Sequence, residues 1–542
     1  MAPIKLDGTR RLSYHRAMAY PFGDENRYRF PSRRTVVHGA RGMACASQPL
    51  AAQAGLDILR RGGNAVDAAV AMAATLTVVE PTSNGIGGDA FALVWSGGKL
   101  HALNGSGPAP RALSLEALKR NPGGTPAIDP HGWEAVTVPG IPASWAALSK
   151  RFGRLSYSEL FREAVTYARD GYPVSPVVAH YWNRAVRAWT PRLQDARYAA
   201  WFDTFAPGGT GPGTGELWRS ENHARTLEEL AATGSESFYR GALAKRIVEF
   251  ARATGGWLEE ADLAEFAPEW TEPVSVDYRG VRVHECPPNG HGLVALMALG
   301  MLGADDFAAL DPVEATHLRV EALKLAFADA RAAFADPRAM AVPPEAFLDP
   351  AYLASRRALI GERASLPEPG RPPRGGTVYL ATADADGNMV SYIQSNYMGF
   401  GSGLVVPGTG IALHNRGCNF STEAGHPNAL GPGKRPYHTI MPGFLTKDGE
   451  ALGPFGVMGG FMQPQGHLQV VANLFDGGMN VQEALDAPRF QWIEGKKVLF
   501  EEALDPDLVA ALAARGHGAE GTPDSGSFGR GQTILRDPSG VL

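Results

Sequence analysis

The chain has 542 residues, of which 44% are hydrophobic and 20% are charged, an ordinary globular composition that excludes a disordered or fibrous protein. The formal net charge is −5, without blocks of like charge, so neither a nucleic-acid-binding nor a membrane-surface protein is indicated. The longest apolar run, 68–79, is shorter than the roughly 20 residues that span a bilayer, and the N-terminus lacks the apolar core of a secretory signal. We expect a cytoplasmic protein that binds neither nucleic acid nor a membrane.

The first third of the chain predicts an arm followed by two helices. Residues 1–35 are polar and interrupted by prolines, which indicates an extended arm. Residues 48–61 place apolar side chains on one helical face, and two glycines then end that helix. Asn64 is a typical N-cap for a second helix up to residue 79, which is apolar almost all round and is therefore expected to lie in the core.

After a mostly helical middle over 112–350, the pattern changes at a linker. Residues 361–376 are rich in proline and glycine, which prevents a helix or a central strand. Alternating strands then predict two hairpins, and helical segments and a last strand follow them. The hairpins are 377–383 with 389–397 and 439–446 with 451–460; the later segments are helices over 466–475, 480–487 and 504–516 and a strand over 532–536.

Motifs for metals and cofactors are weak. The segment from Gly85 to Ala90 fits a loose dinucleotide-binding pattern, but it follows a helix rather than a strand. His284, Glu285 and Cys286 form the densest cluster of ligand-type side chains, and no correctly spaced partner accompanies them. We therefore expect no metal and no cofactor.

The junction of linker and strand, Gly376–Thr377, has the chemistry of a self-activating nucleophile. If the bond between them is cut, Thr377 becomes an N-terminus whose α-amine, with a pKa of about 7.7–8.0, can act as the base for its own hydroxyl. The same hydroxyl can make the cut by attacking the carbonyl of Gly376, which has no Cβ in the way. A loop that simply meets a strand has the same sequence, so this motif alone decides nothing.

A second motif lies about 80 residues further on. Gly459 and Gly460 follow a predicted strand and precede a predicted helix. Two consecutive N–H groups near a helix N-terminus suit an oxyanion hole, although a tight turn has the same pattern.

Many segments, in one order from about residue 36 to the end, resemble the γ-glutamyltransferase family. Those that carry the resemblance are GMACASQPLAAQAGLDILRRGGNAVDAAVA (42–71), EPTSNGIGGDAF (80–91), TVPG (137–140), FYRG (238–241), EALKLAFADAR (321–331), GGT (375–377), DADGNMVS (384–391), GFGSG (399–403), GKRPYHTIMP (433–442), GGFMQPQGH (459–467) and NVQEALDAPRF (480–490).

This resemblance implies an α/β fold of the N-terminal-nucleophile hydrolase type, a four-layer αββα sandwich made by an autoprocessed precursor. Residues 36–376 would be the large subunit and 377–542 the small one, both contributing to one αββα unit after the arm. The resemblance also implies that Thr377 is the nucleophile, that Ser395 keeps a hydroxyl beside it, and that Gly459 and Gly460 form the oxyanion hole. The implied partners are the two subunits of one precursor and a small-molecule amide, with a homo-oligomer of heterodimers as a further option.

The chain departs from the family where family members bind the γ-glutamyl head. Ser106 stands at the position of the arginine for the α-carboxylate, and Asn419 at that of the aspartate for the α-amine. Four further positions also differ: Arg416 replaces a glutamine, Tyr397 an asparagine, and His438-Thr439 a Ser-Ser pair. The pocket has lost one cation and one anion and gained Arg416, which favours an acyl group that has a carboxylate but no amine.

The leading hypothesis is therefore an N-terminal-threonine amidohydrolase acting on a glutaryl-like or oxamate-like amide, similar to the glutaryl-type cephalosporin acylases and the oxamate amidohydrolase of this family. The alternatives are a γ-glutamyltransferase or glutathione hydrolase that binds its donor differently, and a catalytically silent binding protein of the same fold. Arg416 outside the pocket, paired with a surface acid, is the competing interpretation of that residue.

Overall fold

The computed structural model describes residue 30, residues 34–366 and residues 376–542. The arm expected over 1–35 lies outside the described residues except for residue 30 and its last two positions, and so does most of the linker expected over 361–376.

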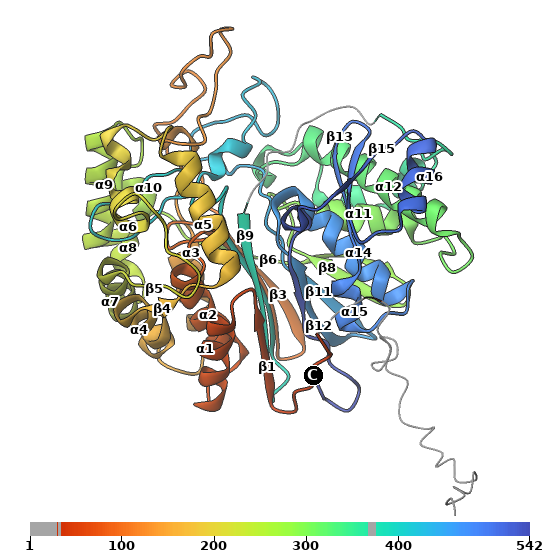
Figure 1. The fold of residues 1–542 in the computed structure, drawn as a ribbon, viewed down its shortest axis with the longest axis horizontal. Helices are drawn as coiled ribbons and strands as arrows, with labels where there is room; N and C mark the ends of the chain where they lie inside the picture. The colour runs from red at the N-terminus through yellow and green to blue at the C-terminus, as the bar shows by residue number, and fades with distance from the viewer. Residues whose placement is uncertain (1–29, 31–33, 367–375) are drawn as a thin grey trace, which may run out of the picture.

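Two antiparallel β-sheets lie face to face at the centre of the described chain (Figure 1). The first has the strand order β1-β9-β10-β2-β3-β6 and the second β16-β12-β11-β8-β7. The strands of the first sheet are β1 (Gly42–Ala46), β2 (Asp89–Ser96), β3 (Lys99–Gly105), β6 (Glu269–Thr271), β9 (Gly376–Asp384) and β10 (Met389–Tyr397); those of the second are β7 (Val274–Tyr278), β8 (Val281–Glu285), β11 (Gly443–Lys447), β12 (Glu450–Val457) and β16 (Gly531–Thr533).

A helical layer from the first half of the chain covers the outer face of the first sheet (Figure 1, left). Helix α2 packs directly on β9 and β10, and Asn64 starts it as predicted, in a capping box with Asp67. Every residue of α2 is buried, which confirms the predicted core helix. The elements of this half are α1 (Pro49–Arg60), α2 (Ala65–Val79), α3 (Ile141–Phe152), α4 (Arg162–Asp170), β4 (Tyr172–Pro173), α5 (Pro176–Trp189), α6 (Ala199–Phe205), β5 (Leu217–Trp218), α7 (Glu221–Thr233), α8 (Glu236–Arg240), α9 (Ala242–Thr254) and α10 (Glu260–Ala264).

A second helical layer covers the outer face of the other sheet (Figure 1, right). Helix α11 packs on β7 and β8, and α14 packs on β12. A small sheet of order β13-β14-β15 lies on this side. The elements are α11 (Gly292–Leu302), α12 (Pro312–Ala333), α13 (Pro350–Arg357), α14 (Gln463–Phe475), α15 (Val481–Asp486), β13 (Phe490–Glu494), β14 (Lys497–Glu501), α16 (Pro506–Ala514) and β15 (Gly518–Thr522).

The residues of β2 show how the layers are built. Because side chains alternate across a strand, Ala90, Ala92 and Val94 pack into the core under the first helical layer. Phe91 and Leu93 point the other way, into the apolar core between the two sheets. Both faces of the strand are buried, and the four-layer αββα sandwich expected from the sequence is confirmed.

Two predictions about local structure need correction. The middle of the chain contains strands β6, β7 and β8 as well as helices. The second hairpin is shorter than predicted, since β11 begins at Gly443 and β12 ends at Val457. Residues 438–442 leave the ladder because their backbone is bonded elsewhere: His438 N–H donates to Asn289 O and Met441 N–H to the side chain of Gln463.

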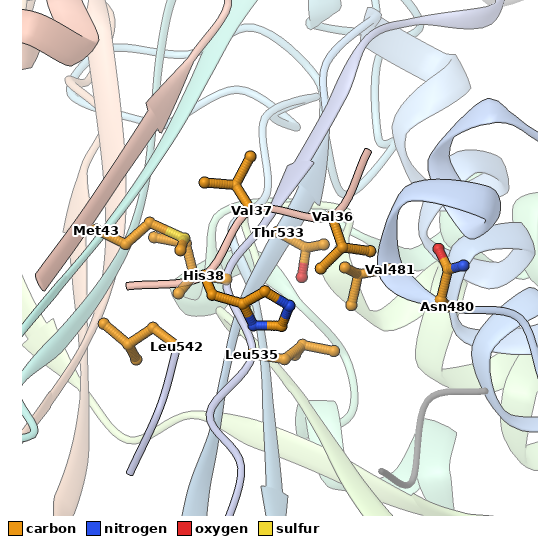
Figure 2. A pocket seen from close by; sticks show the side chains of 10 residues that line it. Val36, Val37, His38, Met43, Asn480, Val481, Thr533, Leu535 and Leu542 are labelled. Atoms are coloured by element: carbon orange, nitrogen blue, oxygen red, sulfur yellow. The ribbon is translucent and has the colours of Figure 1, made fainter. Parts of the chain in front are cut away.

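The C-terminus lies against the chain just before β1. Gly39 and Leu542 exchange two backbone hydrogen bonds of 2.9 Å, and Val36, Val37 and His38 line a cavity of about 30 Å³ beside them (Figure 2). Its other lining residues come from β1, α15 and the C-terminal segment, and Thr377 is not among them. Among the described helices, none has the length and apolar character needed to cross a membrane.

Candidate active site

Thr377 lies at the start of β9, and its side chain is buried and paired. Its hydroxyl donates a hydrogen bond to Ser395 Oγ, 3.2 Å away on the neighbouring strand β10. A bulge in β10 between Gln394 and Tyr397 shifts the register beside Thr377, and such bulges re-aim side chains. Tyr397, just after the bulge, has a φ of 74° and donates its N–H to Ser395 Oγ at 2.7 Å. The structure thus brings together the two hydroxyls that the sequence predicted as neighbours.

Gly459 and Gly460 form the turn between β12 and α14. Their φ angles are 134° and 61°, in the left-handed region that glycine adopts without strain. Within the described chain, no protein group accepts a hydrogen bond from either N–H. Both amides therefore remain available to an oxyanion.

A residue that sequence reasoning missed joins this turn to Thr377. Gln463, the first residue of α14, is fully buried, and its Nε2 lies 3.4 Å from Thr377 Oγ1. No sequence motif assigns a glutamine to this place beside Thr377. The position of Gln463, four residues after Gly459, is the signal that could have indicated it. We call Thr377, Ser395, Gln463, Gly459 and Gly460 the nucleophile cluster.

Arg416 lies on the far side of Tyr397. Its guanidinium carbon is 4.3 Å from the centre of the Tyr397 ring, and its Nη1 donates to Thr439 Oγ1 at 2.6 Å. The side chain is completely buried, and burial lowers the pKa of Arg416 to about 10. Its Nε and Nη2 have no hydrogen-bond partner in the described structure. We call Arg416, Thr439, Tyr397, His438 and Asn419 the Arg416 cluster.

A buried carboxylate, Asp89, lies beside this cluster and contacts two histidines. Asp89 Oδ2 is 3.0 Å from His438 Nε2 and 3.3 Å from His414 Nδ1. Burial acts to raise the pKa of Asp89, and the two histidines outweigh it and hold that pKa well below its usual range. His414 also faces Thr137 O, 3.0 Å from Nε2.

His438 completes this arrangement as a neutral ring. Its Nε2–H donates to Asp89, which leaves Nδ1 to accept the N–H of Ile440 at 3.4 Å. Burial lowers the pKa of His438 to about 3, with a further contribution from the nearby positive charge of Arg416. Arg416 therefore has Asp89 as a nearby acidic group, but it forms no ion pair with a carboxylate among the described residues.

Ser106 and Asn419 differ in how far their side chains are already bonded. The Ser106 hydroxyl is bonded to Asn104 Oδ1 at 2.7 Å and to the side chain of Asn289 at 3.1 Å, so its hydrogen-bonding capacity is used within the protein. Asn419 lies in the same short helical turn as Arg416, and its Nδ2 is buried without a partner among the described residues.

Unpartnered polar atoms gather around Arg416. Besides Arg416 and Asn419, the buried hydroxyl of Tyr397, the buried hydroxyl of Tyr437 and both ring nitrogens of His291 lack partners within the described residues. The ring of His291 packs 6.0 Å from both Tyr437 and Phe461. Since buried polar atoms are nearly always paired in native proteins, this concentration makes the surroundings of Arg416 a candidate site for a polar ligand. His291 and Tyr437 were not predicted, because single aromatic or histidine residues carry no sequence signal.

One cluster elsewhere has the composition of a metal site. Donor atoms of His317, Glu321 and His517 lie within 4.8 Å of one another and are buried. Lys324 Nζ is already 2.5 Å from Glu321 Oε1, and His317 donates to Gly361 O at 2.8 Å. The lysine ammonium thus supplies the cation that Glu321 needs, and the cluster ties α12 to the segment that leads into the linker.

Comparisons with known proteins agree along nearly the whole chain. The sequence model of the gamma-glutamyltranspeptidase family matches residues 51–542. The chain is 37% identical over 519 residues to the glutathione hydrolase-like YwrD proenzyme of Bacillus subtilis, covering 93% of this chain and 96% of that protein. It is 34% identical over 518 residues to the oxamate amidohydrolase proenzyme of Klebsiella pneumoniae, covering 92% and 96%.

A solved structure agrees with both the fold and the sequence. The cephalosporin acylase from Bacillus halodurans superposes with a TM-score of 0.91 at 55% identity, over 96% of each chain. Because the family match and these relatives extend over nearly the full length, the chain belongs to the γ-glutamyltranspeptidase family, as an amide hydrolase or acyltransferase of that family.

Proposed function

We propose that this protein is an autoprocessed N-terminal-threonine amidohydrolase that removes a small, carboxylate-bearing acyl group, glutaryl-like or oxamate-like, from an amide. Thr377 is the nucleophile, and the chain is cut between Gly376 and Thr377 into a large and a small subunit. The names of several relatives as proenzymes support a precursor of this kind.

Cleavage and turnover use the same oxygen. In the precursor, Thr377 Oγ1 attacks the carbonyl carbon of Gly376, the C–N bond breaks with the proton passing to nitrogen, and water hydrolyses the resulting ester. In the mature enzyme the freed α-amine takes the Oγ1 proton while Oγ1 attacks the substrate amide, and the leaving amine receives that proton. Water then cleaves the acyl-threonine ester, and Oγ1 recovers a proton.

The backbone N–H groups of Gly459 and Gly460 stabilise the oxyanion of each tetrahedral intermediate. They are unpaired in the described chain, and a fixed donor of this kind contributes about 10²–10³ to turnover. Before the reaction, Ser395 Oγ accepts a hydrogen bond from the Thr377 hydroxyl, and this hydrogen bond orients Thr377 Oγ1.

The observation that carries the substrate class is that the buried Arg416 forms no ion pair with a carboxylate among the described residues. A fully buried guanidinium with two nitrogens that lack partners among the described residues costs several kcal/mol unless an anion meets it. A second carboxylate on the acyl group supplies that anion, and the hydroxyls of Tyr397 and Tyr437 and the amide of Asn419 are further donors for it. The relationship to an oxamate amidohydrolase and the likeness to a cephalosporin acylase support the same class.

A γ-glutamyl head fits this site less well. Its ammonium group requires an anion, but the carboxylate beside the cluster, Asp89, is engaged with two histidines. Asn419 offers only a neutral amide where the family resemblance implies an aspartate.

A paired substrate comparison tests the proposal. Processed enzyme is assayed with glutaryl-p-nitroanilide, with the γ-glutamyl analogue that adds only the α-amine, and with oxamate. We expect kcat/KM for the glutaryl amide or for oxamate to exceed that for the γ-glutamyl amide by at least tenfold. A tenfold preference for the γ-glutamyl amide would instead establish the glutathione hydrolase alternative.

A further inference from the structure

We propose that Gln463 is a further catalytic residue, whose side-chain amide donates a hydrogen bond to the nucleophilic oxygen of Thr377 throughout the reaction. The inference deepens the proposed function, because it requires Thr377 to be the nucleophile.

The orientation of the Gln463 amide follows from its neighbours. Met441 N–H, which can only donate, lies 3.0 Å from Gln463 Oε1. The amide oxygen is thereby fixed on that side, and Nε2 must face Thr377 Oγ1, 3.4 Å away. The backbone N–H of Met441 therefore determines that Thr377 Oγ1 faces the amide N–H of Gln463 and not its amide oxygen.

Thr377 Oγ1 donates one hydrogen bond and accepts another, each with a different partner. Its hydroxyl proton points to Ser395 Oγ, and a lone pair of Oγ1 receives the N–H of Gln463. Ser395 is itself fixed by the N–H of Tyr397. Gln463 is fully buried at the first position of α14, and its contact with Met441 N–H holds the donor beside the oxygen.

A donor at this place acts when Oγ1 becomes negative. That happens as the proton leaves Oγ1 during attack, and again as Oγ1 departs from the acyl carbon during hydrolysis of the ester. In both steps the amide N–H of Gln463 stabilises the charge and transfers no proton. A hydrogen bond to a charged group is stronger than one to a neutral hydroxyl, so the contact favours both transition states over the resting state.

Helix α14 contains matched controls for Gln463. Gln469 donates to Phe490 O at 3.0 Å and accepts from Phe490 N at 3.0 Å, so it joins the helix to β13. Gln465 makes the same pair of contacts with Trp492. These two glutamines are also buried in the same helix, and their contacts are structural.

The first experiment compares Gln463→Met with Gln469→Met. Self-cleavage of purified precursor is followed on denaturing gels, and turnover of glutaryl-p-nitroanilide is measured with the processed protein. We expect Gln463→Met to slow both rate constants about 10- to 100-fold with KM changed less than threefold, which is the loss of one charge-assisted contact. Gln469→Met is expected to lower the melting temperature while both rate constants stay within threefold of wild type.

The second experiment uses Gln463→Glu and its control Gln469→Glu. A protonated carboxyl at position 463 can still accept from Met441 and donate to Thr377, whereas a carboxylate loses the donor and repels the developing charge. Because burial raises the pKa of a carboxyl group, we expect the activity of Gln463→Glu to fall as pH rises through that raised pKa. Wild type and Gln469→Glu instead gain activity as the α-amine loses its proton near pH 7.7.

The outcomes separate this inference from the proposed function. If Thr377→Ala still cleaves itself or turns over substrate, the proposed function fails. If Thr377 is essential, but Gln463→Met keeps both rate constants within threefold of wild type or Gln463→Glu keeps the wild-type pH profile, then Gln463 is structural and the inference is overturned.

Discussion

The nucleophile cluster and the Arg416 cluster differ in charge and in hydrogen bonding. They touch at Tyr397 of the Arg416 cluster, whose N–H donates to Ser395 Oγ. The three polar side chains of the nucleophile cluster, Thr377, Ser395 and Gln463, are uncharged and bonded to one another or to backbone. Around Arg416 there is a buried charge and a set of donors without partners among the described residues. The groups that we propose for the reaction are thus ordered before any substrate arrives, whereas those that we propose for substrate specificity have polar atoms that a ligand can pair.

The largest expected effect is at Thr377 itself. Thr377→Ala removes the oxygen that both the cleavage and the turnover mechanism use, so the purified protein should remain one full-length chain without activity. Denaturing gels, N-terminal sequencing of any small fragment and the glutaryl amide assay check this. The wild-type small subunit should begin Thr-Val-Tyr-Leu; an intact wild type that still hydrolyses substrate contradicts the mechanism.

Changes in the turn formed by Gly459 and Gly460 should disrupt the nucleophile cluster and leave the Arg416 cluster intact. Gly460→Val forces a β-branched residue to a φ of 61° and redirects the N–H groups, so we expect about 10²–10³ lower kcat with KM for the glutaryl amide little changed.

The matched control for that variant is Gly449→Val in the turn between β11 and β12. Gly449 has a φ of 84°, and a Cβ atom added there would meet nothing within 4 Å. This variant should therefore show the cost of backbone strain in thermal stability and none in kcat. Equal losses of kcat in both variants would mean that Gly460→Val acts through folding, and the oxyanion hole would then lie elsewhere.

Changing Arg416 should weaken substrate binding and leave the nucleophile cluster intact. Arg416→Gln removes the buried guanidinium, and the loss of one charge-assisted contact should raise KM for glutaryl-p-nitroanilide about 10- to 100-fold. KM for the neutral butyryl amide should change little, and so should the rate of self-cleavage, which needs no carboxylate.

Arg279→Gln is the control for a lost arginine outside the site. Arg279 pairs with Asp476 at 2.8 Å, so its removal should lower thermal stability without changing the ratio of the two KM values. An unchanged ratio in Arg416→Gln as well would show that Arg416 does not receive the substrate carboxylate.

The family resemblance indicated the four layers, all five residues of the Arg416 cluster, and every residue of the nucleophile cluster except Gln463. Asn64 with the all-apolar helix after it and the Asp-Gly turn between β9 and β10 are local signals, and the structure has those elements. The resemblance implied that Ser395 lies beside Thr377, and in the structure the hairpin of β9 and β10 brings the two hydroxyls together.

The missed groups come together only through tertiary packing. His291 precedes α11, Tyr437 precedes β11, and Asp89 begins β2, so nothing local relates them. The same holds for Gln463, whose role depends on Met441 fixing its amide. For Ser106, the family resemblance indicated a position in the site but not the two asparagines that occupy its hydroxyl.

The smallest expected effect concerns pH and sharpens the contrast in charge between the two clusters. The nucleophile cluster has no ionisable side chain, whereas His438 in the Arg416 cluster is buried and neutral, with its pKa lowered to about 3. An unfolded histidine binds a proton below about pH 6.5. Between these two values the unfolded chain therefore binds one proton more than the folded chain at this position, so stability falls as pH falls from about 6.5 toward 3.

Removing that histidine should flatten the pH dependence. In His438→Gln, the slope of unfolding free energy against pH between pH 6 and 4 should decrease by about 1.4 kcal/mol per pH unit, the value for one proton. His223→Gln is the matched variant, because burial alone lowers the pKa of His223 to about 4 and the residue lies in the first helical layer. Chemical denaturation at several pH values should give a similar decrease in slope for both variants near pH 6 to 5, while only His438→Gln changes KM for the glutaryl amide. If the slope stays at the wild-type value in His438→Gln, His438 is protonated in the folded protein. The positive charge near Arg416 would then be larger than the hydrogen bonds of His438 with Asp89 and Ile440 indicate.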